Sequence, residues 1–379
     1  MTIVHLVLGK ANPERPNGVN RAVDGLARAQ THLGAQVEVW GITPTPLEPT
    51  SARAYTLRLF PTASSAFRLA RALRSALAAL GPLDVVHLHG GYHPEWHAAA
   101  RILRRGGTGF VITPHGAFRT AVVQANWIKK RAWLALVETR LLERALAVQV
   151  FSQREASELR AYAPHAHCVV LPNGIDCGAE PAAAHAPDGI PRFGFLGRLD
   201  EHTKGLDLLL EGFATYVRAG GRGRLAIVGG GSDEHKLRTQ CARLGLVERV
   251  EFHGERFGED KQRLLEDCDA FLHPSRHEGM PMSVLEAAAR GLPCVLSRET
   301  NLAEDFESAG AGLVLDPLDA PAIAAALLRC DELLAAGALA RMGHAARSLA
   351  RERFEIGALA ARSLRELYGA ATPVASRAG

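Results

Sequence analysis

Short apolar segments alternate with amphipathic helical segments along almost the whole chain of 379 residues. The first apolar segment is Ile3–Leu8, and the helical pattern of Val19–Leu33 follows it. After a stretch at Ala179–Pro191 that is rich in Ala, Pro and Gly, the alternation restarts at Arg192–Leu196. Strands that alternate with helices form a parallel sheet covered on both faces, and the unperiodic stretch has the composition of a linker. The pattern therefore predicts an α/β protein with two doubly wound, Rossmann-like domains facing a cleft.

The boundary between these domains follows from the linker. We expect an N-terminal domain at residues 1–176 and a C-terminal domain at residues 177–354. Further helices are predicted at Ser64–Leu80, Gln124–Ala145 and Ile356–Leu367. In open parallel sheets, ligands bind outside the carboxyl ends of the strands, so the polar segments that follow strands are the first candidates for a site.

Composition excludes several classes of protein. The formal net charge of +4 is too small to indicate a nucleic-acid partner, and no apolar run approaches the ~20 residues that span a bilayer. Ile3–Leu8 is too short for the core of a signal peptide. The six cysteines include no Cys-x-x-Cys pair, which favours reduced thiols over a metal cluster. We therefore expect a cytoplasmic protein.

The segment His277–Gly291 carries the strongest chemical signal. Glu278 and Glu286 flank the sequence Gly279-Met280-Pro281-Met282, where a loop runs into a predicted helix whose first turn contains the proline. A helix N-terminus presents backbone donors and partial positive charge, which suit a phosphate. Carboxylates on either side can bind the hydroxyls of a sugar and a ribose. This segment indicates a nucleotide-sugar site.

A second segment, Phe193–Leu206, contains two cations after a predicted strand. Arg198 can bind phosphate oxygens with two parallel hydrogen bonds, and Lys204 adds a point charge. A solvated loop with two surface cations is the alternative for this segment alone. Together with the two glutamates, the pair favours a diphosphate site.

Three strings now carry a specific resemblance: Gly-Arg-Leu-x4-Lys-Gly, Pro-Ser-x2-Glu-Gly-Met-Pro-x3-Leu-Glu-Ala-x2-Arg-Gly-x-Pro, and Pro172-Asn-Gly-Ile-Asp176. The chain resembles the retaining glycosyltransferases of the GT-B fold, family 4, most strongly from Pro172 to Val314. The resemblance implies that Glu278 contacts the donor sugar, that Glu286 binds the ribose, and that Arg198 and Lys204 bind the diphosphate. It also implies that the C-terminal helix, within residues 355–379, packs back on the N-terminal domain.

The N-terminal half matches the family more loosely. Gly18 stands where the family has a glycine-rich loop facing the donor phosphates, with an ordinary helix start as the alternative. His115 resembles the histidine beside the reacting sugar, with a structural strand-end histidine as the alternative. His89 and His93 are expected on the acceptor side. In the C-terminal half, Gly230 either brings backbone near the nucleotide or simply makes a tight turn.

Two patterns invite other interpretations. His87, His89, His93 and His97 suggest a metal, but they follow no recognised zinc spacing, and Asp267-Cys-Asp269 is interpreted as structural. We therefore expect neither a metal nor a cofactor. The segment Trp127–Trp133 combines indoles with cations; we favour an ordinary amphipathic helix, with peripheral contact at the inner membrane face as the alternative.

The expected function is metal-independent transfer of a sugar from a nucleotide-diphospho-sugar to an acceptor hydroxyl, with retention of the anomeric configuration. Polysaccharide or glycoconjugate assembly is the expected setting, and the acceptor is a glycan, a lipid-linked glycan or a small molecule. His115, Arg198, Lys204 and Glu278 are the predicted catalytic residues. Two alternatives stay open: altered chemistry such as pseudo-sugar coupling, and a non-catalytic nucleotide-sugar binder.

Overall fold

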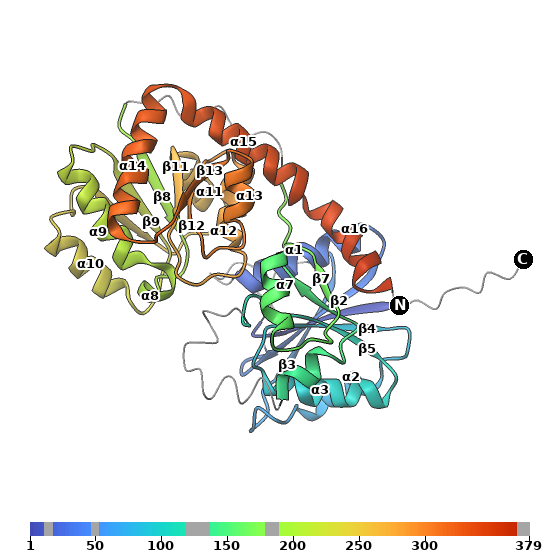
Figure 1. Cartoon of the computed structure of the whole chain (residues 1–379). Helices are drawn as coiled ribbons and strands as arrows, with labels where there is room; N and C mark the ends of the chain where they lie inside the picture. The colour runs from blue at the N-terminus through green and yellow to red at the C-terminus, as the bar shows by residue number, and fades with distance from the viewer. Residues whose placement is uncertain (11–17, 47–52, 119–136, 179–188, 370–379) are drawn as a thin grey trace, which may run out of the picture. The chain divides into compact units, whose positions relative to one another are not determined.

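The computed structural model describes residues 1–10, 18–46, 53–118, 137–178 and 189–369. The chain divides into two compact units (Figure 1). The first contains the start of the chain, Val19–Gly174 and the described part of Ile356–Gly379, whereas the second contains Ile175–Glu355. The predicted pair of parallel α/β domains is confirmed, and each unit has its own sheet and core.

The first unit is built on a sheet of seven parallel strands. The strands are short runs of β-branched and other apolar residues, and β4 is buried along its whole length, as expected of a sheet covered on both faces. In spatial order they are β3 (Thr56–Pro61), β2 (Gln36–Thr43), β1 (Thr2–Leu8), β4 (Val85–His89), β5 (Gly109–Thr113), β6 (Ala147–Val150) and β7 (Cys168–Val170).

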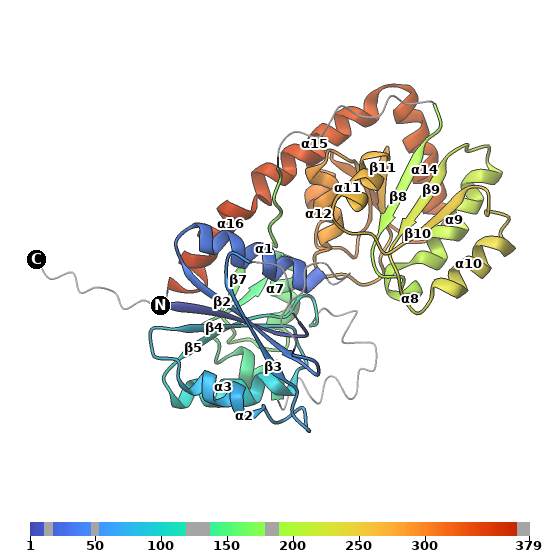
Figure 2. The same ribbon diagram turned by 180° about the vertical axis from the view of Figure 1, so that it is seen from behind.

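Helices cover both faces of this sheet. α2 (Arg71–Ala78), α3 (Pro94–Arg105), α6 (Thr139–Leu142) and α7 (Gln153–Arg160) share one apolar core with Leu6 and Leu88. α1 (Gly18–His32) and α16 (Ile356–Glu366) pack on the opposite face, where Ile3 and Val7 point. The views from two sides show α2 and α3 separated from α1 and α16 by the strands (Figures 1 and 2).

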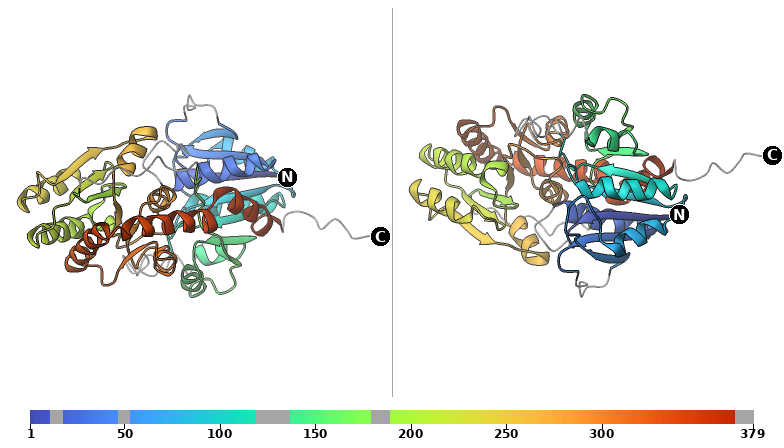
Figure 3. Two further views of the ribbon diagram at one scale, coloured as in Figure 1. Left: turned by 90° about the horizontal axis from the view of Figure 1, so that it is seen from above. Right: turned by 90° about the horizontal axis from the view of Figure 1, so that it is seen from below.

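The second unit has six parallel strands. Their order is β10 (Val250–Gly254), β9 (Arg224–Val228), β8 (Arg192–Leu196), β11 (Ala270–His273), β12 (Cys294–Ser297) and β13 (Gly312–Leu315). α9 (Leu206–Arg218), α10 (Glu234–Arg243) and α14 (Ala320–Ala335) share a core with β8 and β9. The remaining helices are α8 (Glu201–Lys204), α11 (Gly258–Glu266), α12 (Met282–Ala289), α13 (Ala303–Ser308) and α15 (Ala338–Arg353). Views from above and below show the helices of both units (Figure 3).

Several element boundaries differ from the sequence prediction. The helix expected from Ser64 begins only at Arg71, because the segment before it turns, with the Arg68 amide donating to the Ser65 carbonyl over 3.0 Å. Pro281 is the N-cap of α12 and lies before its first turn. The short helices α8 and α13 were not predicted. Most of the expected helix Gln124–Ala145 and the segment Trp127–Trp133 lie outside the described residues.

The C-terminal helix α16 belongs to the first unit. Leu359, Leu367 and Tyr368 are buried there against Ile3 and strands β4, β5 and β6. Within the described residues, no helix is long and apolar enough to cross a lipid bilayer.

Candidate active site

The strongest sequence segments follow two neighbouring strands of the second unit. β8 is followed by Arg198 and Lys204, and β11 is followed by Glu278. From β8 the chain moves to β9 on one side, whereas β11 lies on the other side and leads on to β12. The crossing direction therefore reverses between β8 and β11, which is the point where doubly wound sheets bind ligands.

Lys204 and Glu278 form an ion pair at this point. Their side chains are only 14% and 20% exposed, so the pair is partly withdrawn from water. Nε2 of the buried His273 lies 3.4 Å from the same Glu278 oxygen. Because burial lowers the pKa of His273, its ring is neutral at neutral pH and Nε2–H is the donor. The structure thus joins a predicted phosphate ligand, a predicted sugar ligand and a histidine that the sequence did not indicate.

The ionisation of Glu278 follows from these neighbours. Burial alone would raise the pKa of its carboxyl group, but the charge of Lys204 and the hydrogen bond from His273 hold that pKa at about 2. Glu278 is therefore a carboxylate at neutral pH, and it can accept hydrogen bonds from hydroxyl groups.

Helix α12 brings the second glutamate into the site. Pro281 caps it in an extended conformation with φ −72° and ψ 116°, and all eight of its residues are buried. The first amides of an α-helix have no partner within the helix, so this end suits an anion. Gly279 precedes it, its carbonyl accepting a 3.2 Å hydrogen bond from the Asn301 amide, and Met280 and Met282 are each 6% exposed.

Glu286, one turn into α12, is paired with a residue that the sequence analysis missed. Its Oε2 atom lies 2.9 Å from Nζ of Lys261 on α11, and the two side chains are 8% and 16% exposed. No local pattern marks Lys261, since its helix has an ordinary mixture of charges. Only the tertiary contact between these two side chains shows the pair.

Arg198 lies apart from this cluster. Its side chain is 62% exposed and donates to Asp200 over 3.3 Å. Asp200 is also the N-cap of α8 and accepts a 3.0 Å bond from the Thr203 amide. Among the described residues, no hydrogen bond or ion pair connects Arg198 with Lys204 or Glu278.

Glycines allow the loops after β8 and β9 to approach each other closely. Gly229 has φ +144°, and a Cβ atom on it would overlap the carbonyl oxygen of Gly197. A Cβ on Gly231 would overlap the Leu199 carbonyl, and one on Gly230 would lie 2.9 Å from Cγ of Glu255. Packing against Glu255 therefore leaves little room for a side chain at residue 230, independently of any ligand.

In the first unit, the structure brings His89 and His115 together. Nδ1 of His89 lies 3.1 Å from Nε2 of His115, which follows β5 with the unusual φ of +54° for a side chain other than glycine. His93 is separate: it is the N-cap of α3 and packs edge-on against Trp96 with ring centroids 5.5 Å apart. Gly18 is the first residue of α1 and has no positive φ; residues 11–17, which precede it, lie outside the described residues.

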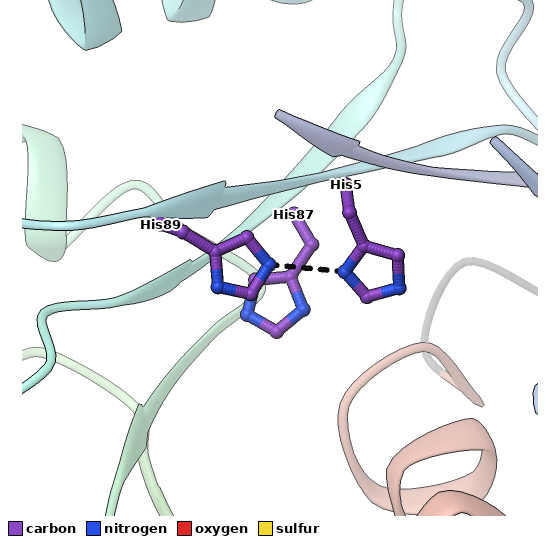
Figure 4. A group of neighbouring side chains, drawn as sticks. All are labelled: His5, His87 and His89. Carbon is purple, nitrogen blue, oxygen red and sulfur yellow. Dashed lines mark hydrogen bonds between the residues drawn. The ribbon is translucent and has the colours of Figure 1, made fainter. Parts of the chain in front are cut away.

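Three buried histidines, His5, His87 and His89, lie close enough together to be considered as a metal site. The sequence pattern groups His87 and His89 with His93 and His97 instead. Strand pairing aligns His5 on β1 with His87 on β4, and His89 follows two residues later, so all three rings point to the same side of the sheet (Figure 4). Every ring nitrogen of the three has a hydrogen-bond partner: each other, or Gln30, Thr113, His115 and Tyr368. In this arrangement the one lone pair of each neutral ring, on Nδ1, accepts a hydrogen bond from a protein group.

Asp267 and Asp269 also have structural roles. Asp267 is the C-cap of α11, and the Asp269 carboxylate accepts a 2.8 Å hydrogen bond from the Arg192 amide at the start of β8. The bond from the Arg192 amide to Asp269 ties the start of β11 to the start of β8, in agreement with the structural interpretation.

The two parallel α/β units define the GT-B class of glycosyltransferase folds. The structure is similar to sucrose-phosphate synthase from Thermosynechococcus elongatus, with a TM-score of 0.81, 21% identity, and 97% and 99% of the two chains covered. It is also similar to Alr3699/HepE of Anabaena, solved in complex with UDP and glucose, with a TM-score of 0.77, 18% identity, and 97% and 100% covered.

Sequence comparison identifies the family. Residues 16–178 match Glycosyltransferase Family 4, and residues 190–332 match Glycosyl transferases group 1; the chain belongs to this family of glycosyltransferases. It is 34% identical over 143 residues to the amylovoran biosynthesis glycosyltransferase AmsK of Erwinia amylovora, covering 36% of this chain and 35% of AmsK. The chain spans less than half the length of the first curated relatives that it matches.

Proposed function

We propose that the protein transfers a sugar from a nucleotide-diphospho-sugar to an acceptor hydroxyl, with retention of the anomeric configuration. One observation carries the proposal: the Lys204–Glu278 pair lies at the point where the crossing direction reverses between β8 and β11, and Glu278 shortly precedes the buried helix α12. A cation, a carboxylate and helix-end amides are the groups that a sugar diphosphate requires. The solved relative that holds UDP and glucose supports the same donor class.

In this proposal, the leaving diphosphate is stabilised without a metal. Lys204 and the first amides of α12 face its developing negative charge, and Arg198 turns from Asp200 to the outer phosphate oxygens. Donor binding separates Lys204 from Glu278, so that the lysine meets phosphate and the carboxylate meets sugar hydroxyls. Glu286 binds the ribose, and Gly18, Gly230 and Gly279–Met282 bring backbone close to the nucleotide.

Retention follows from attack on the face that the diphosphate leaves. The acceptor oxygen forms a bond to the anomeric carbon as the bond from that carbon to the phosphate oxygen breaks. The acceptor proton passes to the departing phosphate, so that the enzyme needs no carboxylate nucleophile of the kind that retaining hydrolases use. His115 lies beside the reacting sugar in this scheme.

The proposal allows several classes of acceptor. The relative named for amylovoran biosynthesis favours polysaccharide or glycoconjugate assembly, with a glycan, a lipid-linked glycan or a small molecule as acceptor. His89 and His93 are the candidate residues on that side; both ring nitrogens of His89 are bonded, to His5 and to His115, so it acts there through His115. We propose a cytoplasmic protein that works at the inner membrane face when its acceptor is lipid-linked.

The test is incubation of the purified protein with UDP-, GDP-, ADP- and dTDP-sugars in the presence of EDTA. We expect one donor to be consumed with release of its nucleoside diphosphate, and NMR of the glycoside to show the donor's anomeric configuration. A product of inverted configuration, or turnover that requires added magnesium, would refute the scheme. Binding of a donor without turnover with any acceptor would favour the alternative of a non-catalytic nucleotide-sugar binder, and turnover to a product other than a glycoside would favour altered chemistry.

A further inference from the structure

Buried hydrogen bonds connect α16 with His115 along one face of the sheet of the first unit. The Gln30 side chain on α1 lies 2.8 Å from Oγ of Ser363 on α16, and its other end lies 2.8 Å from Nε2 of His5. Nδ1 of His5 lies 3.0 Å from Nε2 of His89, whose Nδ1 lies 3.1 Å from Nε2 of His115. We call Gln30, His5 and His89 the relay.

The end at α16 fixes the direction of the first bond. Ser363 donates its single hydroxyl proton to the Ala360 carbonyl over 2.7 Å. Its oxygen can therefore only accept from Gln30, which must present its NH₂ group to Ser363 and its carbonyl oxygen to His5. The same NH₂ group lies 3.4 Å from the Tyr368 hydroxyl.

From Gln30, every later bond has only one possible direction. His5 must carry its proton on Nε2 to donate to the Gln30 oxygen, which leaves Nδ1 as an acceptor. His89 then donates from Nε2 to His5 and accepts at Nδ1, and His115 donates from Nε2 to His89. This reasoning requires one proton on each ring, as is typical of a neutral imidazole.

Burial keeps the rings neutral. It lowers the pKa of His5 to about 4, although the bond to Gln30 acts in the opposite direction. It lowers the pKa of His115 to about 3, and it also lowers the pKa of His89 well below its usual range. A second proton on His5 or on His89 would also place two N–H groups against each other.

His87 belongs to a separate branch. Gln149 donates to the Leu171 carbonyl over 2.9 Å, so its oxygen accepts from Thr113 over 2.7 Å. Thr113 in turn accepts from Nε2 of His87, 2.5 Å away, and Nδ1 of His87 accepts from the Tyr368 hydroxyl over 2.7 Å. This branch holds His87 and makes no bond to the imidazoles of the relay.

We infer that the relay positions His115 for sugar transfer by fixing it as the Nε2–H tautomer, so that Nδ1 accepts a hydrogen bond from a hydroxyl of the substrate. This inference rests on the proposed function. Within the described residues, Nδ1 of His115 makes no hydrogen bond to protein. The left-handed backbone at His115, with φ +54°, holds the ring at the carboxyl end of β5. His89 acts through His115, as a positioning residue.

The decisive variant is Gln30→Met, which keeps the length of the side chain but removes the anchor of the relay. With no acceptor for Nε2 of His5, all three histidines can reverse together, and His115 can then carry its proton on Nδ1. Tyr368→Phe is the matched control, because it removes a buried hydroxyl and its 3.4 Å contact with Gln30 but leaves the two 2.8 Å bonds of Gln30, to Ser363 and to His5, in place.

The readout is the ¹⁵N-histidine NMR spectrum, recorded without substrate, in which the two tautomers of each ring have distinct nitrogen shifts. We expect His115 to be the Nε2–H form alone in the wild type and in Tyr368→Phe. In Gln30→Met we expect a second population with Nδ1–H, together with a loss of kcat/KM of roughly threefold to tenfold, the worth of about one neutral hydrogen bond. Tyr368→Phe should retain wild-type kcat/KM.

Two results would overturn the inference: a wild-type His115 protonated at Nδ1, or a single unchanged tautomer in Gln30→Met. If Gln30→Met fails to fold, His5→Phe interrupts the relay at the next residue, and the wild-type spectrum still decides the tautomer. Because the spectra need no donor, they remain informative if the proposed sugar transfer fails.

Discussion

The carboxylate of Glu286 on α12 lies 2.9 Å from the ammonium group of Lys261 on α11, and both side chains are largely buried. This contact fixes the orientation of the residue that the proposed function assigns to the ribose. Lys261→Met keeps the aliphatic stem but removes that constraint. We expect nucleoside diphosphate affinity to fall by about tenfold, the value of one charge-assisted hydrogen bond.

Calorimetric titration can separate this effect from a general loss of the site. Inorganic pyrophosphate lacks a ribose, so its affinity should be unchanged in Lys261→Met, and Glu286→Ala should show the same pattern. An equal loss for pyrophosphate and nucleotide would contradict the role of the pair.

Lys204→Met should abolish most turnover without unfolding the protein. Removal of one preorganised charge at a developing anion costs about 10²–10³ in rate. The measurement is kcat with the preferred donor, alongside the melting temperature. Lys236→Met is the matched control, since Lys236 also pairs with a glutamate but is 70% exposed. Wild-type kcat in Lys204→Met would remove this lysine from the mechanism.

Gly205→Ala should damage the junction between α8, which ends at Lys204, and α9. Gly205 has φ +65°, and an added Cβ would overlap the carbonyl oxygen of Pro274. Gly220 has φ +95° but no atom within 4 Å of an added Cβ, so Gly220→Ala adds only backbone strain of about 1–2 kcal/mol. We expect Gly205→Ala to lower the urea midpoint of unfolding more than Gly220→Ala does, and to abolish turnover. Equal effects of the two substitutions would show that the structure relaxes to remove the overlap.

The buried histidines should make the first unit sensitive to acid. The folded pKa values of about 4 for His5 and about 3 for His115 lie below the value of about 6.5 in the unfolded chain. The unfolded state therefore binds more protons below pH 6.5, and stability falls as the pH falls. Between pH 7 and pH 5 we expect each of these histidines to cost about 2 kcal/mol.

Urea unfolding at a series of pH values measures this loss. In His5→Phe the decline from pH 7 to pH 5 should be smaller by about the contribution of one histidine. A decline of the same size in both proteins would mean that other groups cause it.

The sequence predicts the strands and the principal site segments of this protein well, because both depend on local patterns. β8 is a run of apolar residues buried in the sheet, and its bounds, Arg192–Leu196, are those expected. The Glu278–Glu286 segment does lead from a strand into a helix. α8 was missed because Asp200 caps only four residues, too few to show a helical period.

Contacts between residues distant in sequence were beyond prediction. His5 and His87 meet because β1 and β4 pair in one register, and nothing in either strand specifies that register. Lys261 reaches Glu286 only once α11 and α12 have packed. The assignments of the individual site residues to phosphate, sugar and ribose remain predictions.

The place of α16 in the first unit has a consequence for biosynthesis. Ile3, Val85 and Val111 are covered by Leu359, Leu367 and Tyr368, and the whole second unit is translated in between. In a nascent chain that has emerged only as far as Gly174, this apolar face of the sheet is therefore still exposed to water. We therefore expect the first unit to be exposed to aggregation and to chaperones until translation reaches Tyr368, and a premature stop before α16 would leave it so.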